Sequence, residues 1–169
     1  MDLSIVIPVY NEENRITATL WKIKTFLSLN TERWPKSEVI VVSDGSGDNT
    51  NAVVQCLMPE FACLKLISCR DNRGKGFAVK SGIAASRGRI VLFSDADGAT
   101  PITELNKLAD LIISNKADIV IASRRMPETQ ISVKQPIYRV LIGHIFSHLT
   151  RIILRMPFLD TQCGFKVFR

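Results

Sequence analysis

The chain has 169 residues, of which 46% are hydrophobic and 22% are charged, and its formal net charge is +6 at neutral pH. This composition excludes a disordered chain and suits one folded domain, because enough apolar side chains are present to build a sizeable core. The positive balance favours an anionic partner, and nucleic acid, nucleotide phosphates and an acidic membrane surface all meet that description. The four cysteines form no CxxC pair, so we expect free thiols in a reducing compartment.

Apolar stretches and turn residues alternate along the chain, and the first residues enter a strand-like run at once, which predicts no signal peptide. We expect strands over residues 3–9, 38–43, 63–68, 90–94 and 118–123. Helices are expected between them, from a cap at Asn11 to about Leu29 and over residues 50–57, 77–86 and 100–115. Five strands that alternate with helices predict an α/β fold: a doubly wound, mostly parallel, Rossmann-like sheet flanked by helices, in a single domain over 1–169.

The predicted fourth strand ends in two acids, Asp95 and Asp97. The continuous apolar run from Ile90 to Phe93 is typical of a strand buried on both faces of a parallel sheet. The two acids then follow the carboxyl end of the strand, where open α/β sheets bind their ligands. Two carboxylates one residue apart can converge on a divalent cation, with phosphate oxygens completing its ligands, and acids at this position can also cap a helix.

Four loops should meet at the carboxyl edge of such a sheet: residues 10–13, 44–48, 95–98 and 124–125. Together they hold acids, glycines and arginines, a mixture that suits a metal-bound nucleotide diphosphate. Lys75 lies between two glycines and can approach phosphate without crowding from a Cβ. The chain has no P-loop motif, and neither of its Gly-x-Gly sequences has the third glycine of the dinucleotide fingerprint.

Residues 136–156 are apolar but are interrupted by Arg139, His144, His148, Arg151 and Arg155. A membrane span needs about twenty consecutive apolar residues, so this segment is not one. The spacing predicts an amphipathic helix with a basic stripe. Such a helix suits a lipid interface, and an ordinary helix that packs on the sheet with its basic edge in solvent has the same pattern.

Three motifs resemble the signature series of family 2 glycosyltransferases: Ile5–Glu12 (IVIPVYNE), Val41–Asp48 (VVSDGSGD) and Asp95–Asp97 (DAD). Narrower motifs resemble the dolichyl-phosphate β-glucosyltransferases and their polyprenyl-phosphate relatives: Asn72–Gly76 (NRGKG), Asp95–Thr100 (DADGAT), Ser123–Arg125 (SRR) and Asp160–Lys166 (DTQCGFK). The resemblance implies a GT-A fold that binds a UDP-sugar and Mg²⁺ or Mn²⁺. It also implies the inverting transfer of glucose from UDP-glucose to a polyprenyl (dolichyl-type) phosphate.

The resemblance also assigns roles to individual residues. Nucleotide-sugar binding is implied for Pro8, Tyr10, Glu12, Asp44, Lys75 and Asp95. Asp95 and Asp97 would hold the metal, and Arg124 would meet the acceptor phosphate, as would Arg139. Gln162 lies in a motif near the reaction centre, so the implied catalytic set is Asp95, Asp97, Arg124 and Gln162.

The chain departs from the family pattern in two places. Ser43 stands where the family usually has an acid, so we expect altered or weaker base recognition. The chain ends at Arg169, inside what the family continues, so we expect a C-terminally truncated domain whose full form works at the cytoplasmic face of a membrane.

Three alternatives to the glucosyltransferase remain at this stage. The first uses GDP-mannose with the same lipid, although Gly98-Ala99-Thr100 favours glucose by resemblance. The second is a non-catalytic domain that binds nucleotide-sugars. The third is a basic nucleic-acid binder, which is disfavoured because aromatic and basic residues are not interleaved and the acids cluster where phosphates would lie.

Overall fold

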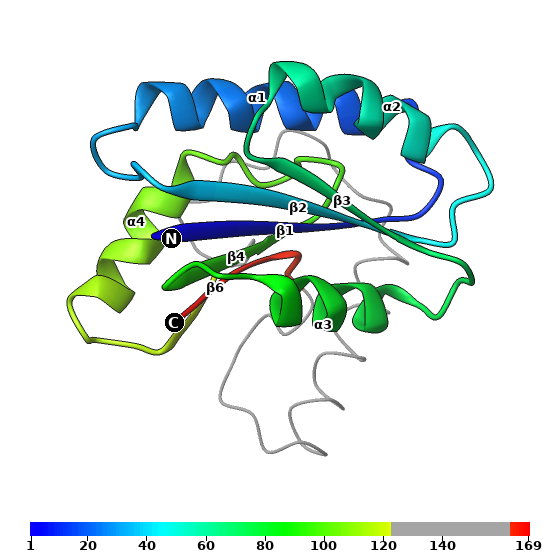
Figure 1. The fold of residues 1–169 in the computed structure, drawn as a ribbon. Helices are drawn as coiled ribbons and strands as arrows, with labels where there is room; N and C mark the ends of the chain where they lie inside the picture. The colour runs from blue at the N-terminus through cyan, green and yellow to red at the C-terminus, as the bar shows by residue number, and fades with distance from the viewer. Residues whose placement is uncertain (123–162) are drawn as a thin grey trace, which may run out of the picture.

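The computed structural model describes residues 1–122 and 163–169. The described residues form a six-stranded sheet in the order β3-β2-β1-β4-β6-β5, with helices on both faces (Figure 1). The strands are β1 (Leu3–Val9), β2 (Ser37–Asp44), β3 (Leu64–Cys69), β4 (Ile90–Ser94), β5 (Ile119–Ile121) and β6 (Phe165–Phe168). The helices are α1 (Ile16–Leu29), α2 (Thr50–Leu57), α3 (Lys75–Ala85) and α4 (Glu104–Ile113), and a 3₁₀ turn, Met58–Glu60, follows α2.

The central strands are buried on both faces, as their continuous apolar sequences predict. All seven residues of β1 and all five of β4 are buried. Figure 1 shows α1 and α2 on one face of the sheet and α3 on the other. The larger core lies under α1, α2 and α4, and a smaller core around Val6, Val42 and Ala78 lies under α3. This three-layer arrangement confirms the predicted α/β class with a mostly parallel sheet.

The strand order places a topological switch point between β1 and β4. From β1 the chain moves outward through β2 to β3, each parallel to its neighbour, and then returns to pair β4 with the other side of β1. Successive connections therefore diverge at the carboxyl ends of β1 and β4. Open α/β sheets bind their ligands in the crevice at such a point.

The prediction of five strands is wrong by one, because β6 lies between β4 and β5 and runs antiparallel to both. β6 has four residues, in which buried Phe165 and Val167 alternate with half-buried ones. So short an alternation gives a weak sequence signal, and the strand forms through its two neighbours. β6 also returns the chain to the carboxyl end of β4, beside Asp95.

The described residues include no helix with the length and apolar character needed to cross a membrane. The predicted amphipathic helix over 136–156 and the predicted site residues Arg124, Arg139 and Gln162 lie outside the described residues.

Candidate functional site

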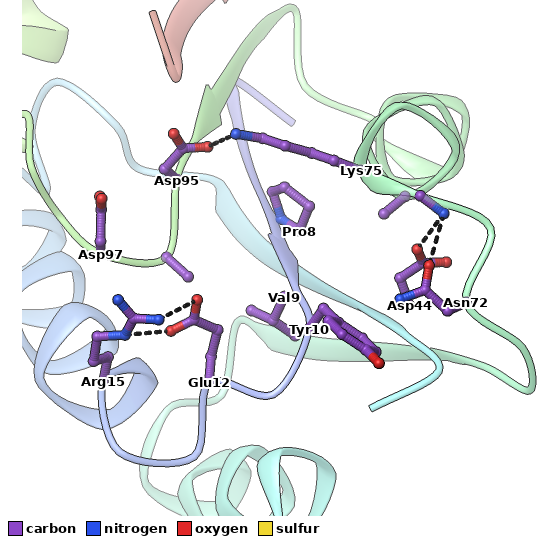
Figure 2. Close-up of a pocket in the computed structure, with 13 residues that line it drawn as sticks. Pro8, Val9, Tyr10, Glu12, Arg15, Asp44, Asn72, Lys75, Asp95 and Asp97 are labelled. Atoms are coloured by element: carbon purple, nitrogen blue, oxygen red, sulfur yellow. Dashed lines mark hydrogen bonds and ion pairs between the residues drawn. The ribbon is translucent and has the colours of Figure 1, made fainter. Parts of the chain in front are cut away.

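A cleft of about 360 Å³ opens at the switch point, a volume in the range of small-molecule sites. Its walls come from the end of β1 and the residues after it, the last residue of β2, the loop before α3 with the start of that helix, and the loop after β4 (Figure 2). All six residues predicted to bind the nucleotide-sugar line it, as does the second predicted metal ligand: Pro8, Tyr10, Glu12, Asp44, Lys75, Asp95 and Asp97. The fold thus brings together side chains that are up to 89 positions apart, 97 minus 8, in the sequence.

Asp95 stands at the end of β4 and is held from two sides. Its backbone N–H donates to the carbonyl of Gly164 at 2.9 Å, one position beyond the ladder that pairs β4 with β6. Its Oδ1 forms an ion pair of 2.6 Å with Nζ of Lys75, and its side chain is 27% exposed. The carboxylate is therefore positioned by the sheet yet remains accessible from the cleft.

Asp97 belongs to the loop that follows and is exposed. Its Oδ1 accepts the backbone N–H of Ala99 at 2.9 Å, which closes a turn through Gly98. Gly98 has a φ of +61°, a conformation that favours glycine. The alternative that Asp95 and Asp97 cap the following helix is wrong, because α4 begins only at Glu104 and its N-cap residue is Thr103.

Asp95 and Asp97 fit a hard divalent cation that is shared with a diphosphate. Both line the same cleft, and their carboxylates supply the oxygen ligands that Mg²⁺ and Mn²⁺ prefer. Within residues 1–122 and 163–169 no group of three or more His, Cys, Asp or Glu side chains could hold a metal alone. A cation held by Asp95 and Asp97 would take only part of its ligands from the protein, which is the usual arrangement where phosphate oxygens and water complete the shell of Mg²⁺.

Asp44 closes the opposite side of the cleft in the view of Figure 2. Its buried carboxylate accepts the backbone N–H of Arg73 at 3.0 Å through Oδ1 and that of Gly74 at 2.7 Å through Oδ2. Gly45, at φ +69°, lies against the backbone of Asn72 so closely that a Cβ would overlap it. Asp44 therefore fixes the loop that leads into α3. This loop in turn positions the backbone of Lys75, the first residue of the helix.

Lys75 is the first residue of α3, and its side chain is 58% exposed. The preceding Gly74 has a φ of +91°, so the chain turns sharply into the helix there. Figure 2 shows Lys75 reaching across the cleft from this helix to Asp95. An ammonium on a flexible stem at a helix N-terminus suits a phosphate group, which would compete with Asp95 for it.

The loops after β1 and β2 are joined by hydrogen bonds, and residues 10–13 and 46–50 together are called the loop clamp. Asn11 was predicted to cap α1, but it adopts φ +55° and its Oδ1 accepts the N–H of Gly47 at 2.9 Å. The N–H of Glu12 donates to Oγ1 of Thr50 at 2.8 Å. The helix consequently begins four residues after Glu12, at Ile16, and the clamp rather than the helix orients the start of this segment.

Asp48 is the acidic centre of the loop clamp. Its Oδ1 accepts both the N–H and the hydroxyl of Thr50, and its Oδ2 accepts the N–H of Glu13 at 3.2 Å. Burial acts to raise the pKa of Asp48, but these hydrogen bonds outweigh it and hold the pKa below its ordinary value. Oε2 of Glu13 in turn accepts the N–H of Asn49 at 2.9 Å, so each loop satisfies donors of the other.

Sequence analysis missed Arg15, which lines the cleft and forms an ion pair of 2.7 Å with Glu12. The spacing of three residues between Glu12 and Arg15 was visible, but it became meaningful only when both residues proved to face the cleft. Ser43 is not among the residues that line the cleft. Its buried hydroxyl donates to Oγ of Ser46 at 2.9 Å, so it supports the turn after β2.

The fold and the paired acids at its switch point agree with what comparisons with known proteins show. Residues 4–169 match the family model "Glycosyl transferase family 2", and the chain belongs to that family. The chain is 35% identical over 178 residues to the dolichyl-phosphate beta-glucosyltransferase of Drosophila melanogaster, covering 99% of this chain and 54% of that protein. It is 35% identical over 175 residues to the human enzyme of the same name, covering 98% and 54%. The chain thus spans about half the length of the curated relatives it matches.

Solved structures share the fold. Mannosyl-3-phosphoglycerate synthase from Rubrobacter xylanophilus aligns with a TM-score of 0.70 at 20% identity, over 99% of this chain and 53% of that chain. Mannosyltransferase PcManGT from Pyrobaculum calidifontis, in complex with GDP-Man and Mn²⁺, aligns with a TM-score of 0.66 at 20% identity, over 98% and 44%. TarS of S. aureus in complex with UDP-GlcNAc gives a TM-score of 0.61 at 26% identity, over 80% and 37%. These neighbours confirm that the sheet is a GT-A fold.

Proposed function

We propose that this chain is the catalytic domain of an inverting glucosyltransferase that moves glucose from UDP-glucose to a polyprenyl (dolichyl-type) phosphate. The observation that carries the proposal is the shared cleft, which is lined by Asp44, Lys75, Asp95 and Asp97 from three separate segments. The similarity to dolichyl-phosphate beta-glucosyltransferases over nearly the whole chain supports this donor and acceptor over others.

In this proposal the donor lies along the cleft with its nucleoside toward Asp44 and Tyr10. Tyr10 is exposed at the end of β1, so its ring is free to contact a base, and buried Pro8 fixes the backbone beneath it. Glu12 lies beside Arg15, where it can accept ribose hydroxyls. The complex of TarS with UDP-GlcNAc supports a uridine diphosphate donor for a sheet of this kind.

The diphosphate then lies between Lys75 and the two acids of the β4 loop. A bound Mg²⁺ or Mn²⁺, held by Asp95 and Asp97, would neutralise the departing diphosphate. Lys75 exchanges its ion pair with Asp95 for a phosphate oxygen and adds positive charge on the other side. The cation and Lys75 would both stabilise the departing UDP more than the bound UDP-glucose, because negative charge develops on the UDP oxygen as its bond to C1 of glucose breaks.

The chemical step needs no strong base from the protein, because the acceptor phosphate is already an anion at neutral pH. A phosphate oxygen attacks C1 of glucose as the bond from C1 to the UDP oxygen breaks, and UDP departs with the electron pair. The configuration at C1 is inverted. The protein's main contribution is to hold two anions in line at reacting distance.

The acceptor side of the proposal rests on residues outside the described range. Arg124 and Arg139 are proposed to bind the acceptor phosphate, and Gln162 is proposed to lie near the reacting atoms. The basic stripe of residues 136–156 is proposed to contact an anionic membrane surface at the cytoplasmic face. Charge reversal at Arg151 and Arg155 should then weaken binding of the chain to vesicles that contain anionic lipid.

A panel of radiolabelled donors with polyprenyl phosphate tests the function, on this chain and on a longer form that includes the part present in its relatives. We expect glucose from UDP-glucose to enter the lipid fraction, in a reaction that a chelator stops. Transfer of mannose from GDP-mannose instead would replace the donor assignment. Binding of UDP without transfer by either form would identify a non-catalytic nucleotide-sugar-binding domain.

A further inference from the structure

Gly164 lies against the carboxylate of Asp95, although the two are 69 positions apart in the sequence, 164 minus 95. The N–H of Asp95 donates to the carbonyl of Gly164 at 2.9 Å, which extends the pairing of β4 with β6 to the first residue of the acidic loop. A Cβ built on Gly164 would overlap Oδ2 and Cγ of Asp95. The backbone of residue 164 therefore forms a wall of the space that the carboxylate occupies.

Gly164 has no local reason to be glycine. The positive φ values recorded among the described residues belong to other positions, and Gly164 enters a regular antiparallel strand. Glycine inside or beside a strand often marks the close approach of another group. Here that group is a carboxylate, and the small hollow behind the acidic loop is lined by Gly164 together with Asp95 and Asp97.

We propose that Gly164 is a positioning residue for the cation site: the missing side chain lets Asp95 hold its carboxylate between Lys75 and the backbone of β6. Lys75 contacts Oδ1, and the position of Oδ2 is limited by Gly164. A methyl group at residue 164 displaces the carboxylate and moves it relative to Asp97. The identity of the cation and nucleotide rests on the proposed function, but the contact between Gly164 and Asp95 does not.

The consequence is that the donor site is completed by a segment far along the chain. Gly164 belongs to the Asp160–Lys166 motif, which the resemblance placed near the reaction centre without giving Gly164 itself a role. The structure shows the last part of that motif paired with β4, the strand that ends directly before Asp95. The described end of the motif is thereby coupled to the position of the Asp95 carboxylate.

Two other glycines provide matched controls. A Cβ on Gly47 would meet nothing within 4 Å, so Gly47→Ala tests the loss of a glycine without a new contact. A Cβ on Gly82, inside α3, would overlap Cγ1 of Val6 and touch Cγ2 of Val42 at 3.0 Å. Gly82→Ala therefore tests overpacking against the sheet away from the cleft, which destabilises the fold through strain alone.

The first experiment measures UDP binding by calorimetry on the full chain, with and without Mn²⁺. We expect Gly164→Ala to lower the Mn²⁺-dependent affinity at least tenfold, to raise the Mn²⁺ concentration needed for half-maximal binding, and to leave metal-free UDP binding unchanged. Gly47→Ala, which keeps the N–H that Asn11 accepts, should keep the parent's dependence on Mn²⁺, and Gly82→Ala should lower the melting temperature without changing that dependence. A parent-like metal titration for a folded Gly164→Ala chain would overturn the proposal.

The second experiment is a stability cycle that needs no ligand. Removing the carboxylate with Asp95→Ala makes room for a methyl group at residue 164, so Gly164→Ala should lower the melting temperature in the parent chain and much less in the Asp95→Ala background. An equal loss in both backgrounds, or failure of the double variant to fold, would show that the glycine serves something other than Asp95. If the parent chain binds no UDP, the proposed function fails while this cycle still decides the role of Gly164.

Discussion

The two edges of the sheet both carry buried or half-buried acids, but the acids have different surroundings. At the amino edge, Glu38 is 1% exposed and both its oxygens are occupied. Oε1 accepts the hydroxyl of Ser4 at 2.6 Å and the N–H of Arg87 at 2.7 Å, and Oε2 pairs with Lys65 at 2.7 Å. At the carboxyl edge, Asp95 is 27% exposed and faces a cleft that it shares with exposed Asp97.

The comparison shows that an acid near a strand end does not by itself make a site. The group around Glu38 is a closed network in which burial is compensated by hydrogen bonds, and such networks fix how elements pack. The acids of the β4 loop keep part of their surface toward the cleft, where a cation can still bind. Removing side chains at the amino edge should therefore change stability, and removing them at the carboxyl edge should change ligand binding.

The largest effect is expected for Asp97→Ala. We predict that Mn²⁺-dependent UDP binding is lost and that transfer by an active form falls about 10³-fold, the size seen when a strong electrostatic stabiliser is removed from a reacting centre. Because Asp97 is exposed and lies in a loop, the melting temperature should change by no more than a few degrees. Calorimetry of UDP binding with added Mn²⁺ measures the first effect and a thermal melt the second. Undiminished turnover with metal present would refute the assignment of Asp97.

Two lysines permit the most direct comparison of the edges, because their ion pairs have nearly equal lengths. Lys75 lies 2.6 Å from Asp95, and Lys65 lies 2.7 Å from Glu38. Lys75→Ala should weaken UDP binding and transfer by about 10- to 100-fold, the range for one lost charged contact to a phosphate. Because the Lys75 side chain is 58% exposed, its loss should leave stability almost unchanged.

Lys65→Ala should give the opposite result. Its side chain is 49% exposed, but its partner is buried, so the variant leaves Glu38 with one fewer compensating group and lowers the melting temperature. Binding of UDP should be the same as in the parent chain. A loss of UDP affinity in Lys65→Ala equal to that in Lys75→Ala would contradict the division between the two edges.

Glu38→Gln is predicted to cost about 2 kcal/mol in the free energy of unfolding at neutral pH, because it removes an ion pair and disturbs a buried network. Burial acts to raise the pKa of Glu38, but the hydrogen bonds from Lys65, Ser4 and Arg87 hold it below its ordinary value. The stabilisation is therefore complete above the ordinary pKa of about 4.3 and is lost as the pH falls through the lower pKa of the folded state.

Urea unfolding from neutral pH down to the acid limit measures this effect. The difference in unfolding free energy between the parent chain and Glu38→Gln should shrink on acidification. A difference that stays constant down to acid pH would mean that the Glu38 network contributes through its shape and not through its charge.

The sequence predicted the layers of the fold because its strands are long apolar runs separated by turn residues. The central strands over 3–9 and 90–94 coincide with β1 and β4, and the acids that follow them lie in the cleft as expected. Pattern alone could place these acids at one edge, since parallel strands share a direction. The resemblance to a known family added the individual roles, most of which remain proposals.

Two features could not be predicted, and both depend on contacts between distant residues. β6 has four residues and is specified by the open sides of β4 and β5, not by its own period. Asn11 has a good capping sequence around it, yet its amide serves Gly47 instead, because the loop clamp competes with the helix for the same polar groups. Local sequence signals predict which segments form helices and strands. Hydrogen bonds between loops decide at which residue a helix such as α1 begins.

The smallest effect is expected at Asp48, which holds the loop clamp at the carboxyl edge without lining the cleft. Asp48→Ala removes the acceptor of three donors and should cost about 1 kcal/mol in unfolding free energy, the usual net contribution of a hydrogen bond, because water can reach these donors in the variant. UDP affinity should fall only a few-fold, because the loop that carries Tyr10 and Glu12 loses its hydrogen bond to Asp48 but keeps those to Gly47 and Thr50. Since the pKa of Asp48 is lowered in the fold, this stabilisation too is lost on acidification.

Asp2 is the matched control for Asp48. It is a carboxylate at the amino edge that accepts the N–H of Lys36 at 3.1 Å and so also holds a loop. Asp2→Ala should lower stability by a similar or smaller amount and leave UDP affinity unchanged, as measured by urea unfolding and calorimetry. If both variants weaken UDP binding equally, the loss follows from general loosening of the sheet, and the loop clamp has no special part in orienting the cleft.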